Sequence, residues 1–137
     1  MYKLRVTRDI AGAHYLPDYE GKCRTMHGHT WTVEVLIAYQ SDLGLTGLYL
    51  AKTGGLIVDF RLIKETIDLF DHVTLNDLLP VPTAEHLASE LYWRLTGHIG
   101  NWLDCDVEGY TKDLGTPKVE WVRVWESKEC YAEYAPS

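Results

Sequence analysis

The stretch Cys23-Arg24-Thr25-Met26-His27-Gly28-His29, with the run from Thr30 to Ala38 that follows it, decides how the rest of this chain is interpreted. The run is rich in β-branched residues and predicts a strand. If His27 and His29 are already extended, the two-residue period of a strand places both imidazoles on one face, with Cα atoms roughly 6–7 Å apart. Two rings at that separation can bind one small cation.

A third imidazole lies upstream, at His14, and Cys23 supplies a thiol close to the pair. Three neutral imidazoles with one open position are the ligand set of a catalytic zinc site. The spacing alone leaves a second interpretation open, in which these are ordinary hydrogen-bonded or exposed histidines.

The composition is that of one globular domain, which we expect to cover residues 1–137. A net charge of −7 disfavours non-specific binding to nucleic acid or to an anionic membrane, so we expect neither as a partner. No apolar run has membrane-spanning length. Three widely spaced cysteines do not form a disulfide framework, so we expect a cytoplasmic protein with a free thiol at Cys23.

The periodicity predicts two strands, two helices and two further strands. The expected strands are 2–8, 30–38, 119–126 and 131–134; one helix follows residue 59, and another runs from an N-cap at Thr83 to a stop at Gly97. Residues 11–22 and 100–117 are expected to be loops. This order indicates an α+β fold, a four-stranded antiparallel sheet with two helices on one face. Its two edge strands favour an oligomer.

Two further groups of residues bear on the chemistry. Asp71 beside His72 can fix the tautomer of the imidazole and raise its basicity, although adjacency alone favours an ordinary helix end and turn. Glu126 shares strand parity with Val122 and Val124, so it points inward if they do, and a buried carboxylate needs a donor partner. A ligand with a cyclic guanidine or amidine would supply two donors; an exposed strand end is the alternative.

Six short motifs in one order, spread over residues 2–134, resemble the 6-pyruvoyltetrahydropterin synthase family. The motifs are His14-Tyr15-Leu16-Pro17, Gly21-Lys22-Cys23 with His27-Gly28-His29, Val58-Asp59-Phe60, Asp71-His72 with Leu75-Asn76, Pro82-Thr83 with Glu85, and Val124-Trp125-Glu126-Ser127. The three-residue gap between Cys23 and His27 resembles the 6-carboxytetrahydropterin synthase branch. The segments from Gln40 to Leu56 and from Gly100 to Lys118 look longer than the family's usual loops.

The resemblance implies a tunnelling fold (T-fold, β-β-α-α-β-β), in which trimers close their sheets into a barrel and two trimers stack as a homo-hexamer. It also implies active sites at subunit interfaces. The implied function is that of a zinc-dependent lyase of queuosine and 7-deazapurine biosynthesis. Such an enzyme converts 7,8-dihydroneopterin triphosphate to 6-carboxy-5,6,7,8-tetrahydropterin and releases acetaldehyde and triphosphate.

Carried over residue by residue, the resemblance implies that His14, His27 and His29 bind Zn²⁺. Cys23 would then be a catalytic base, and Asp71 with His72 a second acid–base pair. Glu126 would bind the pterin through its 2-amino and ring N–H groups. Two alternatives stay open: the sister activity, which only eliminates triphosphate, and a non-catalytic, zinc-stabilised oligomer that binds a pterin or purine.

Overall fold

The computed structural model describes residues 1–40, 56–103 and 116–137. One sheet with strand order β3-β1-β2-β4-β5 carries two α-helices. The strands are β1 (Tyr2–His14), β2 (His27–Tyr39), β3 (Val73–Thr74), β4 (Lys118–Trp125) and β5 (Tyr131–Tyr134). The helices are α2 (Phe60–Asp68) and α3 (Ala84–Leu103), with 3₁₀ turns η1 (Lys22–Arg24) and η2 (Leu75–Asp77).

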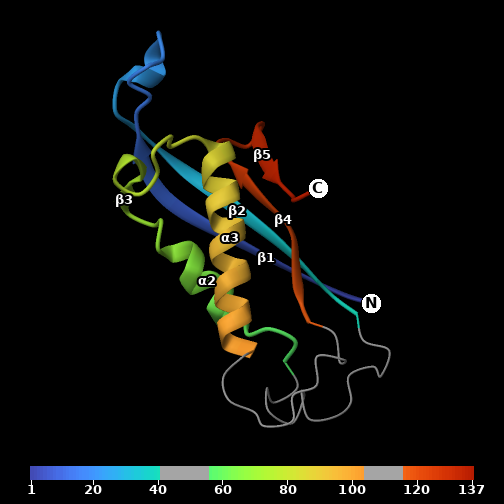
Figure 1. Ribbon diagram of the computed structural model, residues 1–137. Helices are drawn as coiled ribbons and strands as arrows, with labels where there is room; N and C mark the ends of the chain where they lie inside the picture. Colours follow the sequence, from blue (N-terminus) through green and yellow to red (C-terminus); the bar gives the residue numbers. More distant parts are fainter. Residues whose placement is uncertain (41–55, 104–115) are drawn as a thin grey trace.

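The predicted α+β architecture is confirmed, with α2 and α3 lying across the same face of the sheet (Figure 1). The four expected strands are present, and each pairs antiparallel with its neighbour. The sequence did not predict β3, which pairs parallel to β1 opposite Gly12 and Ala13. The sheet is therefore mixed and five-stranded.

Strand β1 is six residues longer than the alternation predicted, and the expected loop starts only after His14. Its inward positions continue through Ile10, Gly12 and His14, all buried, but a glycine and a histidine hide the alternation in the sequence. Because β1 and β2 remain paired to their ends, His14 lies directly opposite His27. This register brings the two histidine segments together.

The core lies between the sheet and the two helices. In β2, the inward residues from Trp31 to Ile37 are fully buried, as the period of two requires. In α2, Ile63, Thr66 and Ile67 form the buried face. The buried side chains of α3 are Ala84, Leu87, Ala88, Leu91, Tyr92, Leu95 and Ile99.

Helix α3 starts where the sequence predicted but ends later. Thr83 accepts a bond from the backbone N–H of His86 at 3.4 Å, as an N-cap does. The predicted stop at Gly97 is wrong, because α3 continues to Leu103 and takes in the first residues of the expected loop. Ile99, 2% exposed, packs into the core, and this burial offsets the cost of about 1 kcal/mol for a glycine inside a helix.

Two edges of the sheet remain open within the described residues: the outer side of β5, and β1 outside the short pairing with β3. No helix in the described part of the chain is long and apolar enough to cross a membrane. The two segments expected to be long, from Gln40 to Leu56 and from Gly100 to Lys118, fall mostly in residues 41–55 and 104–115, which lie outside the described residues.

Candidate functional site

His14 from the end of β1 and His27 and His29 from the start of β2 form one cluster. The ring centroids lie 4.5 Å apart for His14 and His27, 5.1 Å for His14 and His29, and 4.8 Å for His27 and His29. The two β2 histidines share strand parity with the buried Trp31, so they face the helix-covered side. The structure thus brings together the three residues that the sequence singled out as ligands.

Backbone carbonyl groups orient two of these rings. Nδ1 of His14 lies 2.6 Å from the carbonyl oxygen of Pro82, and Nδ1 of His27 lies 2.7 Å from that of Thr25. A carbonyl oxygen only accepts hydrogen bonds, so Nδ1 carries the proton in each ring. In the neutral ring, Nε2 then presents a lone pair, which is how carbonyl groups orient metal-binding histidines.

The donor set fits a metal ion. Nε2 of His14 and Nε2 of His29 are buried, and neither makes a hydrogen bond to any of the described residues. One donor atom from each of four residues, the three histidines and Glu126, lies within 4.8 Å of the others. Buried polar atoms without a partner are costly, and a cation bound between them would remove that cost. These residues could hold a metal ion.

Burial lowers the pKa of His29 below its ordinary value of 6.5. The carboxylate of Glu126 opposes this effect, and the neighbouring His14 and His27 add to it. The lowered pKa favours the neutral imidazole, which is the form that binds metals.

Glu126 directly follows β4 and lies beside the histidines. Its Oε1 is 3.1 Å from Nε2 of His29 and 3.8 Å from Nε2 of His14. This position agrees with its parity with Val122 and Val124, both fully buried. A carboxylate at this place can bind a cation or accept hydrogen bonds from a ligand.

Trp31 packs against the histidine cluster on its buried side, a role that the sequence did not predict. Its fully buried ring packs edge-on against His14 and His29, with centroid distances of 5.0 and 5.1 Å. Its Nε1–H donates to the carbonyl oxygen of Gly12 at 3.1 Å. The available signal was strand parity, since Trp31 is the next inward residue after His29.

The segment 71–82 runs along the end of β1 and fixes its position. Asn76 accepts the backbone N–H of Tyr15 at 3.0 Å and donates to the Tyr15 carbonyl oxygen at 2.9 Å. Together with the bond from His14 to Pro82, this holds the residues around the first histidine on both sides. The Leu75-Asn76 motif therefore has a structural role that its sequence did not reveal.

Asp71 and His72 form a hydrogen-bonded pair attached to Ala11 of β1. Oδ1 of Asp71 accepts the N–H of Ala11 at 2.8 Å, and Oδ2 lies 2.9 Å from Nδ1 of His72. The N–H of His72 donates back to the Ala11 carbonyl oxygen at 2.6 Å. His72 has a φ of 56°, a left-handed backbone conformation sparsely populated by residues other than glycine.

The bond from Ala11 is the main reason that the pKa of Asp71 lies below its ordinary value, with His72 as a further cause. The ionised carboxylate therefore persists beside His72 and can stabilise a protonated imidazole. The side chain of His72 is 82% exposed and points away from the core. Its exposed face is free to meet a ligand or a second subunit.

Cys23 lies on η1, in the connection between β1 and β2, and is partly buried. Among the described residues, the group that could hold a metal ion consists of the three histidines and Glu126 and does not include this thiol. The structure thus places Glu126 in one group with the three histidines, whereas Cys23 and the Asp71–His72 pair lie outside that group.

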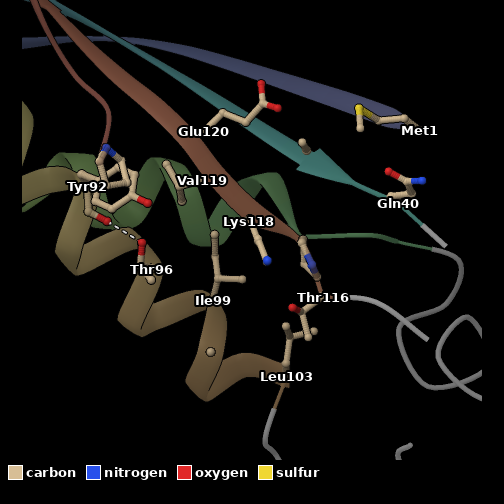
Figure 2. Close-up of a pocket in the computed structure, with 14 residues that line it drawn as sticks. Met1, Gln40, Tyr92, Thr96, Ile99, Leu103, Thr116, Lys118, Val119 and Glu120 are labelled. Carbon is tan, nitrogen blue, oxygen red and sulfur yellow. Dashed lines mark hydrogen bonds between the residues drawn. The ribbon is translucent and has the colours of Figure 1, made fainter. Parts of the chain in front are cut away.

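A pocket of about 970 Å³ lies at the opposite end of the same strands and helix (Figure 2). It is lined by the C-terminal half of α3 from Thr96 to Leu103, the end of β2 at Ala38, the following Gln40 and the start of β4 at Lys118. None of the seven residues proposed from the sequence for chemistry lines it.

Comparison with known proteins finds relatives that are named 6-carboxy-5,6,7,8-tetrahydropterin synthase. A 6-carboxy-5,6,7,8-tetrahydropterin synthase from Synechocystis is 37% identical over 90 residues, 61% of this chain and 66% of that protein. One from Bacillus subtilis is 28% identical over 103 residues, 66% of this chain and 64% of that protein. The aligned parts thus span about two thirds of each relative.

Solved structures with low sequence identity share the fold. The 6-pyruvoyl tetrahydropterin synthase of Caenorhabditis elegans superposes with a TM-score of 0.63 at 19% identity, covering 99% of this chain and 96% of that one. An uncharacterized protein from Wolinella succinogenes gives 0.64 at 18%, covering 99% and 98%. The tunnelling fold expected from the sequence is therefore confirmed.

The match to a protein family covers nearly the whole chain. Residues 3–137 match the family described as 6-pyruvoyl tetrahydropterin synthase. This range includes all six motifs and every residue of the histidine cluster. The chain belongs to the 6-pyruvoyl tetrahydropterin synthase family.

Proposed function

We propose that this protein is a zinc-dependent lyase that converts 7,8-dihydroneopterin triphosphate to 6-carboxy-5,6,7,8-tetrahydropterin, with release of acetaldehyde and triphosphate. The observation that carries the proposal is the convergence of His14, His27 and His29, in which the buried Nε2 atoms of His14 and His29 make no hydrogen bond to any described residue. The relatives named 6-carboxy-5,6,7,8-tetrahydropterin synthase support this branch of the family over the pyruvoyl branch.

The three histidines would hold Zn²⁺ through Nε2, since carbonyl groups occupy Nδ1 of two of them. A bound zinc would supply Lewis acidity toward the hydroxyl groups of the substrate side chain. The surrounding chain keeps the rings in place: Trp31 packs beneath two of them.

The remaining residues of the proposal move protons and orient the pterin. Cys23 acts as a base at the carbons of the ring and side chain, a role that requires the thiolate. His72 transfers a second proton, and Asp71 fixes its ring through the bond at 2.9 Å. Glu126 accepts the 2-amino and ring N–H groups of the pterin, a charge-assisted pair that fixes its orientation.

We further propose a cytoplasmic homo-hexamer built from two trimers, in queuosine and 7-deazapurine biosynthesis. The open edges of β1 and β5 support the pairing of sheets between subunits. The exposure of His72 supports an active site completed by a second subunit, because the ring points away from its own core.

The test is to incubate the purified protein with 7,8-dihydroneopterin triphosphate and to identify the products by mass. We expect 6-carboxytetrahydropterin, acetaldehyde and triphosphate. Triphosphate without acetaldehyde would assign the pyruvoyl activity, and no turnover by the zinc-loaded protein would favour a binding protein.

The matched variants are His27→Ala and His86→Ala. His86 is an exposed histidine on α3 that forms hydrogen bonds with its neighbours Thr83 and Ser89 and, among the described residues, lies outside the group that could hold a metal ion. We expect His27→Ala to lose both metal and activity, whereas His86→Ala keeps both. Equal activity in the two variants would contradict the proposed zinc dependence.

A further inference from the structure

We propose that Glu126 is an exchangeable fourth ligand of the metal: its carboxylate binds the ion in the substrate-free protein and leaves it to bind the pterin. The second half of this inference rests on the proposed function. The first half concerns the metal site alone and can be tested without any substrate.

The distances of the carboxylate are those of a ligand in a tetrahedral site. Zinc bonds of about 2.0–2.2 Å place tetrahedral donor atoms roughly 3.3–3.5 Å from one another. Oε1 of Glu126 lies 3.1 Å from Nε2 of His29 and 3.8 Å from Nε2 of His14, on either side of that range. All four donor atoms lie within 4.8 Å of one another, so small shifts would bring them onto one ion.

Hydrogen bonding does not explain this arrangement. Nε2 of His14 presents a lone pair, because Nδ1 of the ring carries the proton that is donated to Pro82. Nε2 of His29 is also without a hydrogen-bond partner among the described residues, despite the carboxylate oxygen 3.1 Å away. The lone pair of His14 Nε2 thus faces the carboxylate oxygen of Glu126, and a cation bound between them would replace this repulsion with attraction.

The side chain of Glu126 is more exposed than those of His14 and His29, and so has more room to move. The side chain of His14 is 2% exposed and held by Pro82, whereas that of Glu126 is 37% exposed. The backbone N–H of Glu126 donates to the carbonyl oxygen of Cys130 at 3.1 Å, which fixes the main chain while the side chain rotates. The histidines therefore form the fixed part of the site and the carboxylate its movable part.

Glu126 cannot bind the metal ion and the pterin at the same time. Two parallel N–H donors of a pterin require both carboxylate oxygens in a bidentate pair. A carboxylate oxygen that is bound to the metal is not positioned to accept one of these two pterin N–H bonds. Arrival of the pterin edge would therefore withdraw the carboxylate and open the fourth position for the substrate side chain, so that the site opens only when the correct ring is bound.

The first experiment measures zinc affinity by competition with a chromophoric chelator in the absence of substrate. The variants are Glu126→Gln, Glu126→Ala and the control Glu129→Gln, which removes the same charge from an exposed residue three positions away. We expect both Glu126 variants to bind zinc more weakly by roughly 10- to 100-fold, the range for residues that support a metal site. Affinities equal to that of Glu129→Gln would overturn the inference. Circular dichroism confirms that each variant is folded.

The second experiment tests the exchange with Co²⁺ in place of zinc, using visible absorption and unsubstituted pterin, which lacks the side chain and the triphosphate. We expect pterin to change the cobalt spectrum of the wild-type protein and to leave that of Glu126→Gln unchanged. The same change in both proteins, or in neither, would overturn the exchange. A protein that forms no product from the triphosphate substrate would contradict the proposed function, yet the chelator titration would still decide whether Glu126 is a ligand.

Discussion

The indole Nε1–H of Trp31 donates to the carbonyl oxygen of Gly12 at 3.1 Å, and this bond joins the two strands that carry the histidine cluster. Gly12 is paired with His29 across the sheet and lies two residues before His14. The ring of Trp31 fills the space beneath both histidines. The absence of a side chain at Gly12 is what allows the indole to approach the strand.

We therefore expect Gly12→Ala to lower both the stability and the metal affinity of the protein. A Cβ at this position would lie 3.2 Å from Nε1 of Trp31 and 3.4 Å from Cγ of Leu75. Both neighbours are fully buried and cannot move freely, so overpacking should cost about 1–3 kcal/mol of unfolding free energy. Urea denaturation measures the stability, and a chelator titration measures the affinity.

Gly28→Ala is the matched control, because a Cβ there would meet only the carbonyl oxygen of Gly12, at 4.0 Å. Gly28 lies between His27 and His29, so it tests whether any alanine near the ligands disturbs them. If the two variants were equally destabilised, the contact between Trp31 and Gly12 would not be the cause.

Asn76→Ala should loosen the end of β1. The variant loses the bonds to the N–H and carbonyl oxygen of Tyr15 and leaves both groups partly buried. We expect a loss of about 1–3 kcal/mol in unfolding free energy and weaker metal binding, because His14 adjoins the released residue. Thermal denaturation with and without zinc measures both effects.

Asp77→Ala is the control for Asn76→Ala, because Asp77 is the next residue in η2 and is exposed. We expect it to change neither the unfolding free energy nor the metal affinity appreciably. Metal affinity retained by Asn76→Ala would mean that the bond from His14 to Pro82 is enough to hold the first ligand.

The fold class and the pairing of His27 with His29 could be predicted because both depend on patterns between residues that are close in sequence. Alternation of apolar residues and the His27-Gly28-His29 spacing are local patterns, and the sheet preserves them. His14 was harder to place, because Gly12 and His14 interrupt the apolar alternation of β1. Only the pairing of Gly12 with His29 and of His14 with His27 shows that the strand continues.

Interactions across long sequence separations could not be predicted from the sequence. The bonds from Asn76 to Tyr15 and from His14 to Pro82 join residues more than 60 positions apart. The continuation of α3 past Gly97 likewise depends on the burial of Ile99 against the sheet, which outweighs the local preference of glycine. Tertiary packing decided each of these cases.

The pKa of Asp71 leads to a prediction for acid stability. Its pKa in the folded protein lies below the ordinary value of 3.8, chiefly through the N–H of Ala11. The ionised carboxylate therefore stabilises the folded state above pH 3.8, and this contribution is lost as the pH falls through the lowered pKa. We expect Asp71→Asn to lower the Tm at neutral pH and the difference from wild type to shrink in acid.

Asp77→Asn removes the same charge from an exposed position in η2 and separates the local bond from the effect of net charge. A Tm difference between Asp71→Asn and wild type that stayed constant, or grew, on acidification would contradict the assigned direction.

Cys23→Ala should separate catalysis from metal binding. The thiol lies outside the group of histidines and Glu126, so the metal content per subunit should equal that of the wild type. As the proposed base, Cys23 should carry a factor of roughly 10²–10⁴ in kcat. The exposed Cys130→Ala is the control for loss of a thiol and should leave both quantities unchanged. If the Cys23→Ala protein lost its metal, the sulfur would be a metal ligand. If the variant kept its turnover, another residue would carry out the proton transfer. The proposed role of Cys23 as a base requires that the variant keeps its full metal content and loses most of its turnover.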